Sequence, residues 1–153
     1  MLFLRSLVAA LLLGGGAVAI AANTDTEFHL NELLASHPDY QQAWRDVLED
    51  ESRLPEWVIN LSGVAPPMLA VADGGDKYLV GQICEAHNCF SQRLYAAFTW
   101  DKDKAYALLV QVPTGLPLDR APSEHASLRW LGKPDEAVKK LLTEQLQADL
   151  NWY

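Results

Sequence analysis

The sequence predicts an α+β fold in which an antiparallel sheet of about five strands is packed against helices. Three observations support this fold class. Residues 38–48 and 138–146 repeat apolar side chains at helical spacing, whereas residues 68–131 alternate between apolar runs and turn residues. The chain of 153 residues is also long enough for one domain with its own core.

Residues 1–21 are predicted to be a secretory signal peptide. Arg5 supplies the positive charge, an apolar run extends from Leu7 to Leu13, and Ala19-Ile20-Ala21 forms an A-x-A cleavage site. Cleavage there leaves residues 22–153 as a single mature domain. The apolar run is too short to span a bilayer, which argues against the alternative of an uncleaved membrane anchor. We therefore expect an exported protein.

Two helices are expected near the start of the mature chain. The first carries Leu30, Leu33 and Leu34 and ends before His37-Pro38, because the residue before a proline avoids the helical region. The second starts near Pro38 and has an apolar stripe at helical spacing. This stripe consists of Tyr40, Ala43, Trp44, Val47 and Leu48. Trp44, and Trp57 in the turn over residues 54–58, are expected to lie in the core.

The period then changes to that of strands, followed by a last helix. Strands are expected over residues 68–71, 77–83, 91–100, 105–112 and 127–131. Asp73-Gly74-Gly75-Asp76 is typical of a tight hairpin, Asp101 to Lys104 forms a second turn, and residues 116–124 form a crossing loop. The last helix opens after Pro134-Asp135 and presents Val138, Leu141, Leu142, Gln145 and Leu146 on one face.

The two cysteines lie five positions apart in Cys84-Glu85-Ala86-His87-Asn88-Cys89, between two predicted strands. In an exported protein, an even pair of cysteines is most simply a disulfide. It would close a loop at the tip of a hairpin and place His87 near the apex. A loop that is ordered in advance loses less conformational entropy when it docks on a partner.

Other chemistry fits this loop less well. Cys84, His87 and Cys89 are too few for a structural zinc site, which needs four ligands, and redox enzymes use the shorter C-x-x-C spacing. The sequence therefore predicts no metal and no cofactor. The spacing alone leaves two interpretations open: a recognition loop with His87 as the contact residue, or a disulfide that only closes the hairpin.

The charge and the absent motifs narrow the function further. The chain has 20 acidic and 12 basic residues, and removal of Arg5 with the signal leaves 20 against 11, a net charge of −9. Such a protein suits a basic partner and is unsuited to nucleic acid or an anionic membrane surface. No G-x-S-x-G, H-E-x-x-H or phosphate-binding glycine loop is present, so we expect a protein that is not an enzyme.

The cysteine loop has the pattern Cys84-x-x-His87-x-Cys89 and is followed by Ser91-Gln92-Arg93. This combination resembles the signature loop of the Ivy family, periplasmic inhibitors of vertebrate (C-type) lysozyme. The likeness extends upstream to Leu54-Pro55-x-Trp57-Val58 and downstream to Trp100 and Trp130-Leu131. It implies a Gram-negative periplasmic protein whose loop, residues 84–89, enters the active-site cleft of the enzyme. The ring histidine, here His87, would then lie between the two catalytic carboxylates.

The loop departs from the family's best-known loop, in which Lys-Pro precedes the histidine and Asp follows it. Glu85-Ala86 and Asn88 stand in those places here, which leaves the affinity and the preferred lysozyme open. The oligomeric state is also open, and a homodimer remains compatible with the sequence. The alternative function is a periplasmic binding or chaperone-like domain that recognises cell-wall fragments or another envelope protein.

Overall fold

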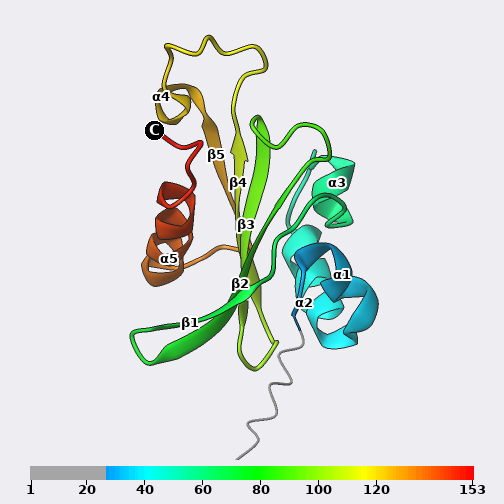
Figure 1. Cartoon of the computed structure of the whole chain (residues 1–153). Helices are drawn as coiled ribbons and strands as arrows, with labels where there is room; N and C mark the ends of the chain where they lie inside the picture. The colour runs from blue at the N-terminus through cyan, green and yellow to red at the C-terminus, as the bar shows by residue number, and fades with distance from the viewer. Residues whose placement is uncertain (1–26) are drawn as a thin grey trace, which may run out of the picture.

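The computed structural model describes residues 27–153, so the predicted signal peptide lies outside the described residues. Within residues 27–153 the chain forms five helices and five strands (Figure 1). In chain order these are α1 (Leu30–Ser36), α2 (Pro38–Glu49), α3 (Glu56–Ile59), β1 (Leu69–Asp73), β2 (Asp76–Cys84), β3 (Gln92–Thr99), β4 (Ala105–Gln111), α4 (Pro122–His125), β5 (Ser127–Leu131) and α5 (Glu136–Gln147).

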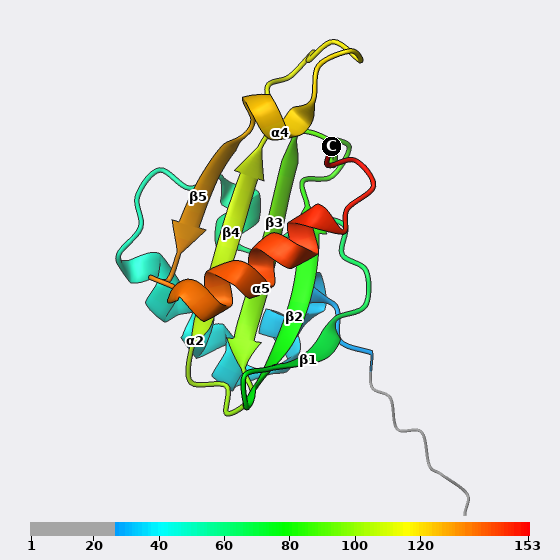
Figure 2. The same cartoon turned by 90° about the vertical axis from the view of Figure 1, so that its left-hand side faces the viewer.

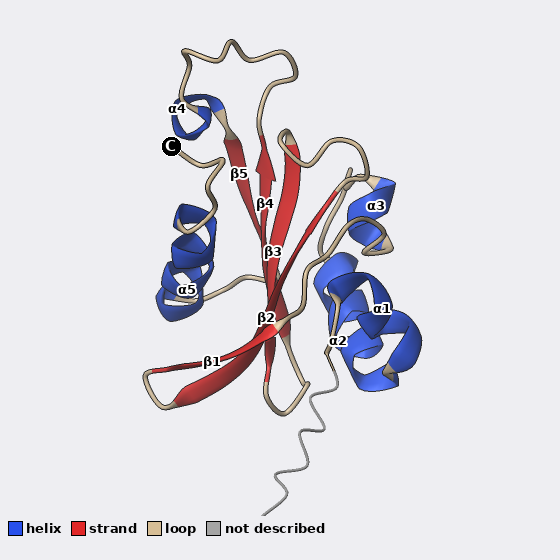
Figure 3. Cartoon of the chain, in the orientation of Figure 1, coloured by secondary structure: helices blue, strands red, loops and turns tan. Residues whose placement is uncertain are grey.

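The five strands form one antiparallel sheet in the order β1-β2-β3-β4-β5, so strands that follow each other in the chain are also neighbours in the sheet (Figure 3). The predicted hairpin turn closes the first pair, in which Asp73 lies opposite Asp76. Gly74 and Gly75 adopt φ angles of 58° and 94°, which glycine reaches without the strain of a side chain. The predicted α+β fold class is confirmed.

Helices cover both faces of this sheet. The helices α1, α2 and α3 pack on one face and α5 crosses the other face (Figures 1 and 2). Because side chains alternate along a strand, Leu94 and Phe98 of β3 belong to the core under α1 and α2, while Tyr95 and Ala97 belong to the core under α5. The sheet is therefore the middle layer of three.

The predicted apolar anchors lie where the sequence places them. Trp44 and Trp57 are buried, and Tyr40 contacts Phe98 edge to face with ring centroids 5.2 Å apart. Asp135 caps α5, because its side chain accepts a hydrogen bond of 2.9 Å from the backbone N–H of Val138. The tryptophans are thus core residues, as expected.

Two short helices differ from the expected loops. The single-turn helix α3 overlaps the expected turn over residues 54–58 and extends to Ile59. The single-turn helix α4 overlaps the end of the expected crossing loop and extends to His125. Each begins at a proline or directly after one, and proline presets the φ angle of a first helical turn. None of the helices within residues 27–153 is long and apolar enough to cross a membrane.

The meander places two connections at the same end of the sheet. Strands β2 and β4 run toward that end and β3 and β5 run away from it, as antiparallel neighbours must. The cysteine loop between β2 and β3 therefore lies at the same end as the long connection between β4 and β5 (Figures 1 and 2).

Candidate functional site

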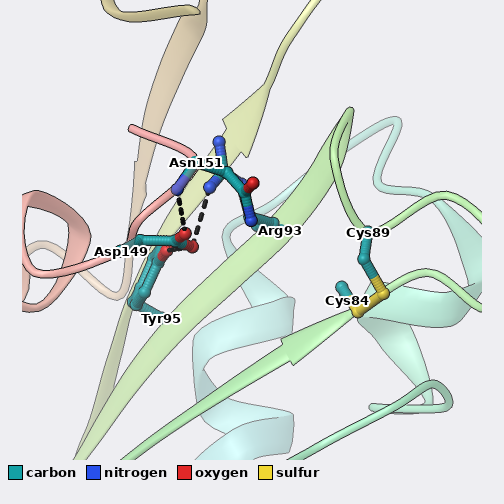
Figure 4. Close-up of polar contacts among 6 residues, drawn as sticks. All are labelled: Cys84, Cys89, Arg93, Tyr95, Asp149 and Asn151. Carbon is teal, nitrogen blue, oxygen red and sulfur yellow. Dashed lines mark hydrogen bonds and ion pairs between the residues drawn. A yellow bond between two sulfur atoms is a disulfide. The ribbon is translucent and has the colours of Figure 1, made fainter. Parts of the chain in front are cut away.

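A disulfide between Cys84 and Cys89 closes the loop, with their Cα atoms 4.8 Å apart. Cys84 is the last residue of β2, and Cys89 precedes the first residue of β3 by three positions (Figure 4). The predicted disulfide is confirmed. Both sulfur atoms are used in this bond, so neither cysteine serves as a thiolate ligand or as a thiol nucleophile. We call residues 84–89 the ring.

Hydrogen bonds order the ring from within. The backbone N–H of Asn88 donates to the carbonyl oxygen of Glu85 at 3.0 Å, and the Asn88 amide Nδ2 donates to the Glu85 carboxylate at 2.7 Å. The backbone N–H of Glu85 donates to Gln92 O at 3.2 Å. Glu85 and Asn88, two of the residues that depart from the family's best-known loop, are therefore partners that brace the turn between them.

His87 occupies the apex of this turn and is exposed. Its φ angle of 63° lies in the left-handed region, which few residues other than glycine adopt and which often marks functional positions. Among residues 27–153 no side chain or backbone group forms a hydrogen bond with its imidazole. Both ring nitrogens are thus available to a partner outside the chain.

The segment of Gly63 and Val64 supports the ring at the end of β2. The backbone N–H of Val64 donates to Cys84 O, and that of Cys84 donates to Val64 O, each at 3.0 Å. A Cβ atom at Gly63 would lie only 2.1 Å from the carbonyl oxygen of Cys84. A glycine is needed here because backbone has to approach backbone so closely.

Ser91 and Gln92 attach the other arm of the ring to β4. Ser91 is buried, and its carbonyl oxygen accepts a hydrogen bond of 2.8 Å from the backbone N–H of Val112. The side chain of Gln92 accepts a hydrogen bond of 3.0 Å from that of Gln111. These contacts give a structural role to the first two residues of the Ser-Gln-Arg motif.

Arg93 completes the motif and lies in register with Cys84 on the neighbouring strand. Its side chain is 5% exposed, and its Nη1 donates to the Asp149 carboxylate at 2.7 Å (Figure 4). The Tyr95 hydroxyl donates to the same carboxylate oxygen at 2.8 Å, and the indole ring of Trp152 lies 5.9 Å from the guanidinium carbon. The segment after α5 is thereby fixed to the base of the ring.

Electrostatics hold this cluster in one charge state. Burial alone would raise the pKa of Asp149, but hydrogen bonds from the Asn151 N–H, Tyr95 and Arg93 outweigh it and lower the pKa. Burial raises the pKa of Tyr95, and the hydrogen bond to Asp149 adds to this shift. The carboxylate therefore stays ionised while the phenol stays protonated, which is the arrangement that both hydrogen bonds require.

Fold and site together define an α+β protein that presents a short disulfide-closed loop at one end of an antiparallel sheet. The family model described as inhibitor of vertebrate lysozyme (Ivy) matches residues 39–148. The chain belongs to this family, which is one of inhibitors.

Two relatives from Pseudomonas aeruginosa cover nearly all of the chain. One, described as an uncharacterized protein, is 59% identical over the whole of both chains. The other, named inhibitor of vertebrate lysozyme, is 35% identical over 92% of each chain. An uncharacterized protein of Yersinia pestis is 32% identical over 78% of this chain and 77% of its own.

Proposed function

We propose that this protein inhibits C-type lysozyme by inserting the ring, residues 84–89, into the active-site cleft, and that His87 is the central contact. The observation that carries the proposal is an ordered ring with an exposed histidine at its apex, in a chain of the Ivy family. The relative named inhibitor of vertebrate lysozyme, which aligns over 92% of both chains, supports the same partner. The protein acts by occlusion and carries out no reaction.

The chemistry of an imidazole suits such a cleft. A retaining glycosidase holds two carboxyl groups about 5 Å apart, one of them an acid and the other a carboxylate. An imidazole has a nitrogen on each side of the ring and can form one hydrogen bond through each. Glu85, the acidic residue two positions before His87, is hydrogen-bonded to the Asn88 amide, which holds its carboxylate within the ring.

The proposed site of action is the periplasm. It follows from the predicted signal peptide over residues 1–21 and the predicted mature domain over residues 22–153. Expression of the full chain in a Gram-negative host should yield a periplasmic protein whose intact mass corresponds to a start at Ala22. A full-length mass in the membrane fraction would instead support an uncleaved anchor.

A lysis assay tests the proposed function directly. Purified mature protein is added to hen egg-white lysozyme before a suspension of susceptible cells, and the fall in turbidity is recorded. Protection that becomes complete near equimolar inhibitor supports occlusion of the active site. Undiminished lysis at micromolar inhibitor would reject the proposal and favour a domain that recognises cell-wall fragments or an envelope protein.

The disulfide is expected to order the ring rather than hold the fold together. Replacing both Cys84 and Cys89 with serine should lower the free energy of unfolding by no more than about 2 kcal/mol, because so short a ring removes little entropy from the unfolded chain. Inhibition should weaken clearly in the same variant, because the open loop must be ordered on binding. Urea unfolding and inhibition titrations measure the two effects. Global unfolding of the variant at room temperature would contradict this role.

The negative charge is expected to speed the encounter with a basic enzyme. Residues 22–153 carry 20 acidic and 11 basic residues, a net charge of −9. The association rate constant should therefore fall steeply between low and physiological salt, while the dissociation rate constant changes little. Stopped-flow or surface plasmon resonance measurements over that salt range provide the test. An association rate that does not vary with salt would limit the charge to a role in solubility.

A further inference from the structure

The ring is too small to form a stable complex by itself. It contributes six residues, whereas a specific interface of standard size takes about 20–30 residues from each partner. Other surface at the same end of the sheet has to contribute. The candidates are the residues that directly follow the ring and the two segments that are hydrogen-bonded next to it. One segment contains Val64 and is bonded to Cys84, and the other begins at Val112 and is bonded to Ser91.

Three exposed apolar side chains lie on those segments. Val64 is 57% exposed and follows Gly63 at the Cys84 arm, and Phe90 is 40% exposed directly after Cys89. Leu118 is 94% exposed on the β4–β5 connection, whose first residue, Val112, is bonded to Ser91. We call Val64, Phe90 and Leu118 the apolar collar.

Leu118 lies in a hydrogen-bonded turn, and the fold makes almost no use of its side chain. The backbone N–H of Arg120 donates to Pro117 O at 3.0 Å, so Leu118 follows a proline in a tight turn. The buried Pro122 of α4 and the hydrogen bond at Val112 fix the two ends of the connection. An apolar side chain that is left in water on a backbone turned in advance is suited to contact a partner, because the backbone loses little entropy on docking.

We propose that the apolar collar contacts the surface of the same C-type lysozyme molecule around the mouth of its cleft, with Leu118 as a second anchor at the same end of the sheet as the ring. This inference rests on the proposed function. The partner is fixed by continuity, because the β2–β3 and β4–β5 connections share one end of the sheet (Figures 1 and 2). Backbone hydrogen bonds also join Val64 to Cys84 and Val112 to Ser91.

Leu118→Ser tests the second anchor, with Leu69→Ser as a matched control because Leu69 is 60% exposed on the edge strand β1, outside the collar and outside the segments that support the ring. Binding of hen egg-white lysozyme is measured by surface plasmon resonance, and the melting temperature of each variant is recorded. Leu118→Ser should raise the Kd about tenfold, mainly through faster dissociation, as expected when a leucine is no longer buried. Leu69→Ser should bind as the wild type does.

The outcomes separate this inference from the proposed function. If the wild type neither binds nor inhibits lysozyme, the proposed function fails. If the wild type inhibits and Leu118→Ser binds equally well, the second anchor is wrong while the proposed function stands. If Leu118→Ser keeps the Kd but alters self-association in sedimentation velocity, the collar contacts a second copy of this chain and the inference is overturned.

A double variant combines Leu118→Ser with His87→Ala. Its loss of binding free energy should be nearly the sum of the two single losses, since the two side chains are separate contacts.

Discussion

Replacing His87 with alanine is expected to weaken inhibition of C-type lysozyme by a factor of tens. A central contact that loses water on binding typically contributes about 2 kcal/mol or more when truncated. His87 is exposed at the apex of the ring and has no hydrogen-bond partner within the described residues, so its loss should affect the complex and leave the fold intact. The inhibition constant measures the first effect, and the melting temperature measures the second.

A second variant separates the side chain from the shape of the loop. Because His87 has a φ angle of 63°, alanine could disturb the backbone, whereas asparagine tolerates the left-handed region. His87→Asn should therefore keep the loop and still lose most of the inhibition, because an amide is shorter than an imidazole and does not reach both carboxylates. If both variants inhibit as strongly as the wild type, the ring is not the inhibitory surface.

Much of the fold could be predicted from the sequence because its elements are specified locally. The stripe from Tyr40 to Leu48 has helical spacing, and Gly74-Gly75 occurs where a two-residue hairpin needs positive φ angles. The helix α4 could not be predicted in this way. Its four residues have no apolar period, and it is held in place by the burial of Pro122.

The disulfide-closed ring can be predicted from the sequence, whereas the contact between Arg93 and Asp149 that supports it cannot. Cys84 and Cys89 are close in the chain, so their pairing is a local property. Asp149 is 56 residues from Arg93 and lies beyond the last predicted helix, and nothing around it in the sequence indicates a buried partner. Arg93 nevertheless indicates that such a partner exists. It begins a run of apolar strand residues, and a charge buried there requires an opposite charge somewhere in the fold.

Removal of the Asp149 carboxylate is expected to be among the most destabilising single changes near the ring. Asp149→Ala leaves the guanidinium of Arg93, which is 5% exposed, without the partner at 2.7 Å. Within residues 27–153 its Nε and Nη2 atoms are buried and have no hydrogen-bond partner, so no other group takes over. An uncompensated buried charge costs about 3 kcal/mol or more. Tyr95→Phe, which removes one hydroxyl from the same cluster, should cost only about 1 kcal/mol.

The effect of pH gives an independent check of this cluster. The pKa of Asp149 is lowered in the fold, so the ionised carboxylate contributes stability that is fully present above its ordinary value of 3.8 and is lost as the pH falls through the lowered value. The difference in unfolding free energy between the wild type and Asp149→Asn should stay constant near neutral pH and shrink in acid. Urea unfolding from pH 7 to pH 3 measures it, and a difference that grows in acid would contradict the assignment.

A double variant then tests whether Arg93 and Asp149 act as a pair. Arg93→Met together with Asp149→Ala removes both charges, so no buried ion is left without a partner, and the loss of stability should be smaller than the sum of the two single losses. Because Arg93 lies opposite Cys84, the Asp149→Ala variant should also inhibit lysozyme more weakly, through a ring whose base is less well fixed. Additive losses of stability would show that the two side chains are not coupled, and unchanged inhibition in Asp149→Ala would show that the ring keeps its shape without this support.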